Sequence, residues 1–454
     1  MIVMKFGGTS VESQEAINRV AAIVKQFESR RPVVVVSAMG KTTNKLLEIA
    51  RLAALGEQEE AFGLVHELRA AHVLHGLALA GDRGRELETV LQARFDWLQD
   101  LVRGLAIVQE LSPRSSDAVA SLGEQLSSVI VTFAFRNAGI GAEHVDSREV
   151  VVTDENFTHA QPITGETYRR LQASVRPIAE KAVVVMGGFI GSTMNGQTTT
   201  LGRGGSDFSA SLIGAGLNAE EIQIWTDVDG MLTADPRIIP GGHRVKSISF
   251  AEAAEMAYFG AKVLHPATVL PAIEKNIPVL ILNSRRPHVE GTKITANPTP
   301  CRNPVKSISC KRNVTIVNVN SSRMLMAHGF LRRMFEIFDR HEISVDMIST
   351  SEVSVSLTLE GSHNLDEIVR ELEEFASVRV ETGQALVCLV GENIRHTPGI
   401  AARTFGALKG NIRMISQGAS EMNLGFVVSD KEVPEVVEVL HREFFSELDP
   451  NVFE

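Results

Sequence analysis

Hydrophobic runs recur along the first two thirds of the chain, separated by segments in which apolar residues return every three or four positions. The runs are short and rich in valine and isoleucine, with little polar alternation. They lie at residues 2–6, 32–37, 182–186, 222–225 and 278–282. This pattern is typical of strands that are buried on both faces of a parallel sheet. We therefore predict five strands of one central sheet.

Helices are predicted between these strands. Segments 15–27 and 95–111 have the apolar spacing of helices that cover one face of a core. Strands that alternate with helices indicate an α/β sandwich with crossover connections. Ligands of such sheets bind beyond the carboxyl ends of the strands, and the glycine-rich segments that follow the predicted strands fall there.

The composition changes near residues 291–307, where threonine, asparagine and three prolines gather. Such a segment favours an extended connector over a packed element. We expect a domain boundary at this point.

The part of the chain beyond this connector repeats itself. A Gly-Phe pair followed by spaced apolar residues is echoed about 70 positions later by a Gly-Ile pair with similar spacing. The paired positions are Gly329, Phe330, Phe335, Phe338, Ile343 and Ile348 in the first copy, and Gly399, Ile400, Phe405, Leu408, Ile412 and Ile415 in the second. Helical core periodicity alone explains the apolar spacing. The glycine-led turn and the serine-containing strand in both copies favour a duplicated module that reads strand, turn, helix, strand, strand, helix.

Composition limits the class of protein. The 454 residues allow two to four domains, and 44% hydrophobic and 22% charged residues are ordinary for a soluble globular chain. The net charge of -10 and the lack of a basic run argue against nucleic acid as a partner. Three cysteines without C-x-x-C spacing indicate neither a disulfide framework nor a zinc site.

The N-terminal residues do not have the pattern of a secretory signal, and no uncharged apolar run is long enough to span a bilayer. We therefore expect a cytoplasmic protein that has no membrane partner.

The segment 198–207, TTTLGRGGSD, is the most informative stretch of the chain. Its glycines at 202, 204 and 205 allow positive φ and turn backbone N–H groups toward one point. Arg203 adds a planar fork that suits a carboxylate or a phosphate. A solvated glycine-rich turn does not need all of these features, so we predict an anion-binding loop.

A second candidate anion site follows the first predicted strand. The sequence KFGGTS places Lys5 beside Gly7 and Gly8 at the end of that strand, where a phosphate could rest. The alternative is a solvated lysine at a strand end.

Two familiar phosphate-binding motifs are excluded by spacing. Gly40-Lys41-Thr42 resembles the end of a P-loop, but the position that needs the first glycine holds Val35. The dinucleotide fingerprint would need a third glycine at 207, which is an aspartate.

Further polar residues follow other predicted elements, in the segments 225–230 (WTDVDG), 233–237 (TADPR) and 259–266 (FGAKVLHP). The segment 122–124 (LGE) carries an isolated carboxylate, Glu124. Each has a plain alternative. Asp227 and Asp229 could terminate a turn, Glu124 could lie on a helix surface, and His265 before a proline could be structural.

Taken together, these motifs resemble the aspartate kinases, members of the amino-acid kinase fold. KFGGTS, SAMGKTTN, LGE, TTTLGRGGSD, WTDVDG, TADPR and FGAKVLHPAT occur in the order of that family across essentially the whole chain. The distal half is similar to their paired ACT modules, with SVDMISTSEVSVSLTL as the most specific stretch. The resemblance is to the monofunctional, lysine-sensitive type. We expect no fused homoserine dehydrogenase like that of bifunctional relatives.

The resemblance implies a fold and a domain plan. We expect an α/β amino-acid kinase fold, a three-layer sandwich with a mainly parallel central sheet, followed by two ferredoxin-like ACT domains. The catalytic domain would span 1–294, the effector-binding ACT domain 308–384, and the regulatory and oligomerising ACT domain 385–454.

The activity implied is transfer of the γ-phosphoryl group of ATP to the β-carboxylate of L-aspartate, the first step toward lysine, threonine and methionine. A carboxylate nucleophile is already ionised at neutral pH, so no general base is needed. Mg²⁺ would be carried mainly by the phosphates, and no side-chain metal site is expected.

The family's site residues carry over to matching positions. Lys5 would contact the phosphoryl group as it is transferred, and Asp207 would orient the Lys5 side chain. Arg203 would clamp the α-carboxylate of the substrate, and Glu124 its α-ammonium. The remaining substrate contacts would come from Thr43, Gly204, Gly205 and Ser206. The nucleotide would lie along Lys5, Gly7, Gly8, Thr226, Asp227, Leu232, Arg237, Lys262 and Val263. Leu232 stands where some relatives place a tyrosine, which puts aromatic contact with the nucleotide in doubt.

The ACT resemblance implies an amino-acid effector. Asp346 and Glu352 could meet a cationic ligand, which points to lysine. Ala327 replaces a serine of some lysine-sensitive relatives, and threonine remains the alternative. The expected effector residues are Met324, Phe330, Leu331, Ser344, Val345, Asp346, Thr350, Ser351 and Glu352. ACT elements commonly pair across subunits, so we expect a homodimer or homotetramer. These strands could also serve dimerisation alone.

Two other functions stay open at this level. One is a kinase of the same fold that acts on another acidic substrate, such as glutamate. The other is a non-catalytic ACT sensor with an inactive kinase-like domain. Retention of Lys5, Arg203, Asp207 and Lys262 argues against the sensor.

Overall fold

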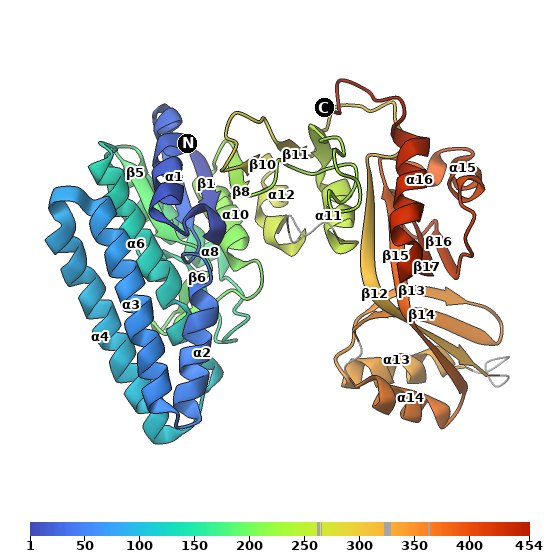
Figure 1. Cartoon of the computed structure of the whole chain (residues 1–454), viewed down its shortest axis with the longest axis horizontal. Coiled ribbons are helices and arrows are strands. Elements are labelled where there is room, and N and C mark those ends of the chain that lie inside the picture. Colours follow the sequence, from blue (N-terminus) through green and yellow to red (C-terminus); the bar gives the residue numbers. More distant parts are fainter. Residues whose placement is uncertain (261–263, 265, 322–327, 362–363) are drawn as a thin grey trace. The chain divides into compact units, whose positions relative to one another are not determined.

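The structure is a computed structural model that describes residues 1–260, 264, 266–321, 328–361 and 364–454. It divides into two units, shown in Figure 1. The first comprises Met1–Gly230 and Leu264–Pro298, and the second Met231–Val263 and Thr299–Glu454. The segment Met231–Val263 thus groups with the C-terminal part of the chain.

A mainly parallel sheet forms the centre of the first unit. Its strands run in the order β3, β5, β2, β1, β8, β10, β11, and only β11 is antiparallel to its neighbour β10. The bounds are β1 (Ile2–Phe6), β2 (Pro32–Val36), β3 (Ala142–His144), β5 (Val183–Gly187), β8 (Ile222–Thr226), β10 (Val279–Asn283) and β11 (Thr292–Thr295). The five strands predicted from hydrophobic runs are confirmed to within about one residue at each end.

Helices cover both faces of this sheet. Successive side chains of a strand point to opposite faces, and β1 shows the result. Ile2, Met4 and Phe6 belong to the large core shared with α1, α2, α3, α4 and α6, while Val3 lies near Gly214 of α10 on the other face. Figure 1 shows α2, α3, α4 and α6 gathered side by side. The three-layer arrangement that was expected is confirmed.

The helices of this unit are α1 (Gln14–Gln26), α2 (Thr42–Ala54), α3 (Gln58–Ala80), α4 (Gly84–Val108), α5 (Pro113–Ala120), α6 (Leu122–Asn137), α7 (Ser147–Val150), α8 (Thr164–Arg170), α9 (Arg176–Ala179), α10 (Gly205–Leu217) and α12 (Leu270–Glu274). The helix predicted at 95–111 begins eleven residues earlier, at Gly84. Its first turn is mostly polar and follows Gly81, which reads as a turn in the sequence. The prediction of its start was wrong for that reason.

The helical segment Pro113–Asn137 is long and apolar enough to cross a membrane, but 94% of its apolar window is buried inside the molecule. Core helices of globular proteins have this property.

A small second sheet positions the glycine-rich loop. Its strands are β4 (Val152–Thr153), β6 (Ile190–Thr193) and β7 (Thr198–Thr200), in the order β4, β6, β7. Strand β7 leads directly into the loop that precedes α10.

The second unit is built on a six-stranded antiparallel sheet in the order β13, β14, β12, β15, β17, β16. Each copy of the sequence repeat forms a long strand, a helix, two strands and a helix, so the predicted duplication is confirmed. The first copy holds β12 (Ser307–Asn320), α13 (Phe330–Arg340), β13 (Val345–Thr350), β14 (Ser354–Glu360) and α14 (Leu365–Glu373). The second holds β15 (Ser377–Val390), α15 (Ile400–Ala407), β16 (Met414–Gln417), β17 (Asn423–Ser429) and α16 (Val433–Phe445).

The two long strands link the copies. The first half of β15 pairs with the second half of β12, and the second half of β15 pairs with both β17 and the start of β12. Helices α13 and α14 pack over one core with β12 and β14.

Two further elements, β9 (Ser247–Ser249) and α11 (Phe250–Tyr258), belong to this unit. A capping box of Ser249 and Glu252 begins α11. Glu252 also forms an ion pair at 3.0 Å with Lys306, and both side chains are fully buried.

Helix α11 is also bonded to both copies of the repeat. Tyr258 donates its hydroxyl to Asp346 of β13, and Glu255 accepts hydrogen bonds from Ser420 and Asn423.

Candidate active site

The carboxyl ends of β1 and β2 supply the first parts of the candidate site. Lys5 and Phe6 end β1, and the chain then turns through Gly7 and Gly8. Gly8 is held against the exit of β2, because the Gly40 amide donates to its carbonyl. A Cβ on Gly8 would lie 3.0 Å from the Ala38 carbonyl oxygen. The glycine at 8 therefore permits close approach of the two strand ends.

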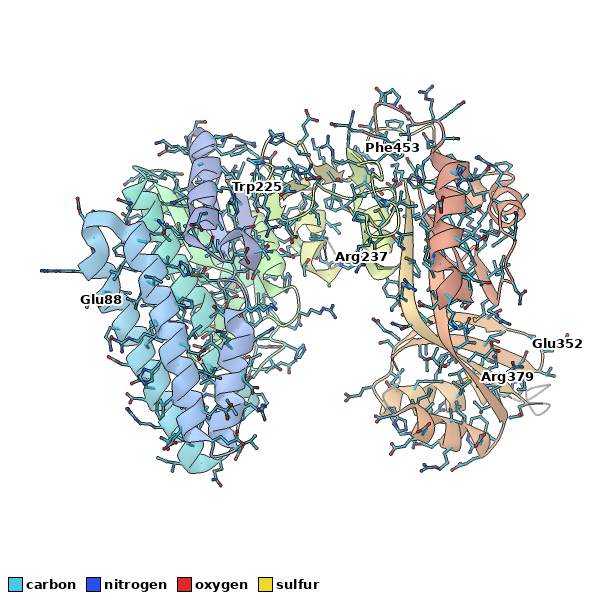
Figure 2. All side chains as sticks on the ribbon, in the orientation of Figure 1. Glu88, Trp225, Arg237, Glu352, Arg379 and Phe453 are labelled. Carbon is cyan, nitrogen blue, oxygen red and sulfur yellow. The ribbon has the colours of Figure 1, made fainter. Side chains whose placement is uncertain are left out.

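Lys5 is buried and paired. Its Nζ lies 2.6 Å from Oδ1 of Asp207, in the first turn of α10, and both side chains are largely shielded from water. The amide of Gly7 donates to Trp225 of β8, whose ring stacks on Phe6 at 5.8 Å. Figure 2 labels Trp225 among the strands of the first unit. The Lys5 ammonium is thus positioned by β1, which carries the side chain, and by Asp207 of α10, which pairs with it.

The glycine-rich loop has the backbone that its sequence predicts. Gly202 and Gly204 have φ of 72° and 73°, in the left-handed region that favours glycine. A Cβ on Gly205 would come within 2.7 Å of the Phe189 ring. Helix α10 begins at Gly205, so its positive dipole end faces the loop, an arrangement that attracts anions. The Gly205 and Asp207 amides already donate to the carbonyls of Gly202 and Gly204.

These elements enclose one pocket of about 330 Å³. Its lining includes seven of the residues predicted for catalysis and substrate binding, and also Gly8, which was predicted for the nucleotide. The seven are Lys5, Thr43, Glu124, Gly204, Gly205, Ser206 and Asp207. Residues separated by about 200 positions in the chain therefore meet at one sheet edge. Gly7 is adjacent, since a Cβ built there would lie 3.6 Å from the Lys5 ammonium nitrogen.

Arg203 is not in the lining. It lies in the loop between Gly202 and Gly204 with an exposed side chain. It has no hydrogen bond or ion pair with any residue that the structure describes. The guanidinium is therefore free to reach a bound anion.

Glu124 is a further ionisable group of the pocket. It lies in the first turn of α6 and is 3% exposed, so the alternative of a surface residue is wrong. Oε1 accepts the Ala38 amide at 3.1 Å, while Oε2 is buried without a partner among the described residues. Burial raises the pKa of Glu124 to about 8, against the opposing effects of the Ala38 amide and of Lys5. A cationic ligand would give the buried Oε2 of Glu124 the partner that it lacks among the described residues.

Four lining residues were not predicted as pocket walls: Ser37, Ala38, Gly40 and Phe189. Gly202, which also lines the pocket, was predicted as part of the anion-binding loop. Three of the four leave β2, a strand exit that was noted without a role for each residue. Phe189 has φ of 65°, rare for a bulky side chain. The pair Gly187-Gly188 before it was a usable signal, because a Cβ on Gly188 would come within 2.9 Å of the Ser206 Cα.

The residues predicted for the nucleotide are distributed over both units. Thr226 ends β8 next to β1, and its carbonyl accepts the Ser284 amide. Asp227 follows it. Leu232 and Arg237 belong to the second unit, where Arg237 is 81% exposed and pairs with Asp235. Lys262 and Val263 lie outside the described residues.

The residues predicted for the effector come from the first copy of the repeat. Phe330 and Leu331 form the first turn of α13, after Gly329 with φ of 86°. Val345, Asp346 and Thr350 lie on β13, with Ser344 just before it. Ser351 and Glu352 form the turn to β14, where Figure 2 labels the exposed Glu352. Met324 and Ala327 lie outside the described residues.

Asp346 already has partners. Its two oxygens lie 2.9 and 3.0 Å from the ammonium of Lys311, and one also accepts the Tyr258 hydroxyl. Its side chain is 4% exposed. A cationic effector would have to compete with Lys311 for this carboxylate.

Comparison with known proteins agrees with this arrangement. Residues 1–283 match the model of the amino acid kinase family, and residues 317–373 and 387–444 match that of the ACT domain. Aspartokinase 2, chloroplastic, of Arabidopsis thaliana is 40% identical over 471 aligned residues, which cover 99% of this chain and 85% of the relative. Lysine-sensitive aspartokinase 3 of Escherichia coli is 39% identical and covers 98% of this chain and 99% of the relative.

Two solved structures are similar over nearly their whole length. Aspartokinase III of Escherichia coli in complex with aspartate and ADP has a TM-score of 0.84 at 37% identity, with 98% of this chain and 100% of that chain covered. The same enzyme in complex with lysine and aspartate has a TM-score of 0.85 at 37% identity, covering 98% and 99%.

Proposed function

The chain belongs to the amino acid kinase family and, within it, to the aspartokinases, and we propose a residue-level mechanism and an effector on that premise. It phosphorylates the β-carboxylate of L-aspartate with ATP, giving 4-phospho-L-aspartate and ADP. The observation that carries the mechanism is the pocket in which the Lys5–Asp207 pair and the buried Glu124 face the glycine-rich loop.

The chemical step needs alignment and charge neutralisation. A β-carboxylate oxygen of aspartate attacks the γ-phosphorus, and the bond from that phosphorus to the bridging oxygen breaks, leaving ADP. The carboxylate is ionised at neutral pH, so no proton has to be removed. Lys5 would place its ammonium on the transferring phosphoryl group, and Asp207 would hold that ammonium in place.

Substrate recognition would use the two remaining charged groups. Glu124 would take the α-ammonium, which satisfies its unpartnered oxygen. Arg203 would take the α-carboxylate with two parallel hydrogen bonds. Thr43, Ser206 and the amide of Gly204 would hold the other oxygens. Gly205 would lie beside them, with its own amide bonded to the Gly202 carbonyl. One acid and one base set at fixed separation select an α-amino acid.

Mg²⁺ would enter with the nucleotide. Among the described residues no group of three histidine, cysteine or acidic side chains could hold a metal, and Asp207 is engaged with Lys5. We propose that the ion is held mainly by the phosphate oxygens, where it neutralises their charge. Thr226, Asp227, Leu232, Arg237, Lys262 and Val263 stay proposals for the nucleotide.

We propose lysine as the feedback effector, bound by the first ACT module. The Escherichia coli relative is described as lysine-sensitive and has been solved with lysine. Asp346 offers a carboxylate to a cationic side chain. Threonine is the alternative effector. We also propose that the chain forms a homodimer or homotetramer through its ACT modules.

A substrate panel tests this function. ADP release is measured with aspartate and with glutamate, each with and without lysine and threonine. We expect turnover with aspartate, little with glutamate, and inhibition by lysine. Preference for glutamate would overturn the substrate assignment, and indifference to both amino-acid effectors would leave the ACT modules as a scaffold.

A further inference from the structure

A buried carboxylate outside the pocket ties together the elements that carry its charged groups. Asp117 lies in α5 and is 1% exposed. Its Oδ2 accepts the amides of Thr158 at 2.9 Å and Thr200 at 3.0 Å, and its Oδ1 accepts the Thr200 hydroxyl at 2.6 Å. Burying a carboxylate costs free energy unless hydrogen bonds compensate for the lost water. Asp117 accepts three such bonds, which indicates a specific role for this side chain.

Asp117 and Glu124 are connected through a continuous helical run formed by α5, Ser121 and α6. Helices α5 and α6 are separated only by Ser121, which itself has helical φ and ψ. The Ser121 amide donates to the Asp117 carbonyl, and the Gln125 amide donates to the Ser121 carbonyl. Residues seven apart lie on the same face of such a helix, so Asp117 and Glu124 share a face two turns apart.

On the other side, Asp117 holds the base of the glycine-rich loop. Thr200 is the last residue of β7, three positions before Arg203. Thr158 has a strained φ of 72°, and its carbonyl lies 3.2 Å from the Cβ position of Gly202. The Thr200 carbonyl also accepts a hydrogen bond from the Ala160 amide. The segment that follows Thr158 is therefore bonded directly to the end of β7.

We propose that Asp117 is a positioning residue that sets the separation between Glu124 and Arg203, and thereby the recognition of the α-amino acid. It does not line the pocket and so acts through these two groups. Without its carboxylate, two amides and one hydroxyl lose their partner, and the loop is free to move relative to α6. Small displacements of this kind impair substrate alignment strongly. This inference rests on the proposed substrate contacts of Glu124 and Arg203.

The test separates positioning from folding. Asp117→Ala removes all three bonds, and Asp117→Asn keeps the shape and part of the bonding. Thr200→Val removes only the Thr200 hydroxyl from Asp117. Thr199→Val is a matched control, because Thr199 is equally buried on the same strand but its hydroxyl bonds Thr153 instead. For each variant, KM is measured for aspartate and for ATP, together with the thermal unfolding midpoint.

For Asp117→Ala, we expect KM for aspartate to rise about tenfold or more while KM for ATP changes less than about twofold. Asp117→Asn should restore much of the aspartate affinity, and Thr200→Val should show a smaller rise that Thr199→Val lacks. If Asp117→Ala does not fold, the two threonine variants decide. Equal changes in both KM values, or equal effects of Thr199→Val and Thr200→Val, would overturn the proposal. Lack of aspartate turnover by the wild-type enzyme would instead overturn the proposed function.

Discussion

At the scale of single residues, the catalytic proposal depends on the Lys5 ammonium. It is buried beside Asp207 at the end of β1, so it is positioned before any ligand arrives. Such preorganised charge is worth far more in a shielded site than in water.

Lys5→Ala should therefore lower kcat by about two orders of magnitude, or roughly 3 kcal/mol of transition-state stabilisation. The measurement is steady-state ADP release. Lys41→Ala is the control, since Lys41 follows Gly40 of the pocket wall but is exposed. Near-normal turnover of Lys5→Ala would contradict the assigned role.

Glu124 gives a pH prediction. Its pKa is raised to about 8 in the ligand-free protein because it is buried, and an α-ammonium beside it would favour the ionised form. Aspartate binding should then release a proton at neutral pH, and the affinity should increase as pH rises from about 6 to about 8. Calorimetric titrations in buffers of different ionisation enthalpy measure this release. Affinity that does not change across this range would contradict the role.

The same group affects stability with a defined sign. Between the ordinary carboxyl pKa of 4.5 and about 8, the folded protein holds a proton on Glu124 that the unfolded chain has lost. Its contribution to the free energy of unfolding therefore falls as pH rises through this interval. Glu124→Gln should stabilise the ligand-free protein more at about pH 8 than at about pH 5, as urea unfolding would show. An equal effect of Glu124→Gln on the free energy of unfolding at both pH values would contradict this prediction.

Residue identities in the site were predictable where a motif carried them. Lys5, Glu124 and the loop from Gly202 to Asp207 were found from motifs and family resemblance. The unpartnered Oε2 of Glu124 and the hydrogen bonds of Asp117 were not, because burial and hydrogen bonding depend on segments that are far apart in the chain. Asp117 has no motif of its own in the sequence.

At the scale of elements, helix α11 depends on a buried ion pair. Glu252 begins the helix through its capping box and also holds the fully buried Lys306. Removing one partner leaves the other charge buried and unpaired.

Glu252→Ala should thus lower the free energy of unfolding by about 3–5 kcal/mol, as measured by urea denaturation. The double variant Glu252→Met with Lys306→Met should recover much of this loss, because no charge then stays buried. A loss below about 1 kcal/mol for the single variant would show that the pair is solvated in solution.

The contact between β12 and β13 predicts how the effector site responds. Lys311 binds both oxygens of Asp346, so an effector amine that binds Asp346, as proposed, would have to displace it. Lys311→Met should lower the lysine concentration for half-inhibition by about fivefold or more. Arg312→Met is the control, because Arg312 pairs with Asp430 and not with Asp346. An unchanged or higher half-inhibitory concentration for Lys311→Met would contradict competition at Asp346.

Element prediction succeeded where hydrophobic runs were continuous, as in β1 and β2, and for the duplicated modules. It failed for the start of α4, where polar residues and glycines hide a helix whose apolar stripe begins only at Leu87. The small sheet that supports the glycine-rich loop was not predicted either. Its strands of two to four residues are too short to leave a periodic signal.

At the scale of the whole molecule, the pocket and the expected effector residues lie in different units. The pocket belongs to the first unit and the expected effector residues to the second. The association of Met231–Val263 with the second unit was not visible in the sequence, because its attachment depends on long-range contacts such as Tyr258 with Asp346.

The most direct test identifies the product. Purified enzyme is incubated with ATP, Mg²⁺ and either aspartate or glutamate, and hydroxylamine traps any acyl phosphate as a hydroxamate. We predict β-aspartyl hydroxamate from the wild-type enzyme, little glutamyl product, and about a hundredfold less product from Lys5→Ala. Glutamyl hydroxamate as the main product, or equal yields from the wild-type and Lys5→Ala enzymes, would contradict the site described.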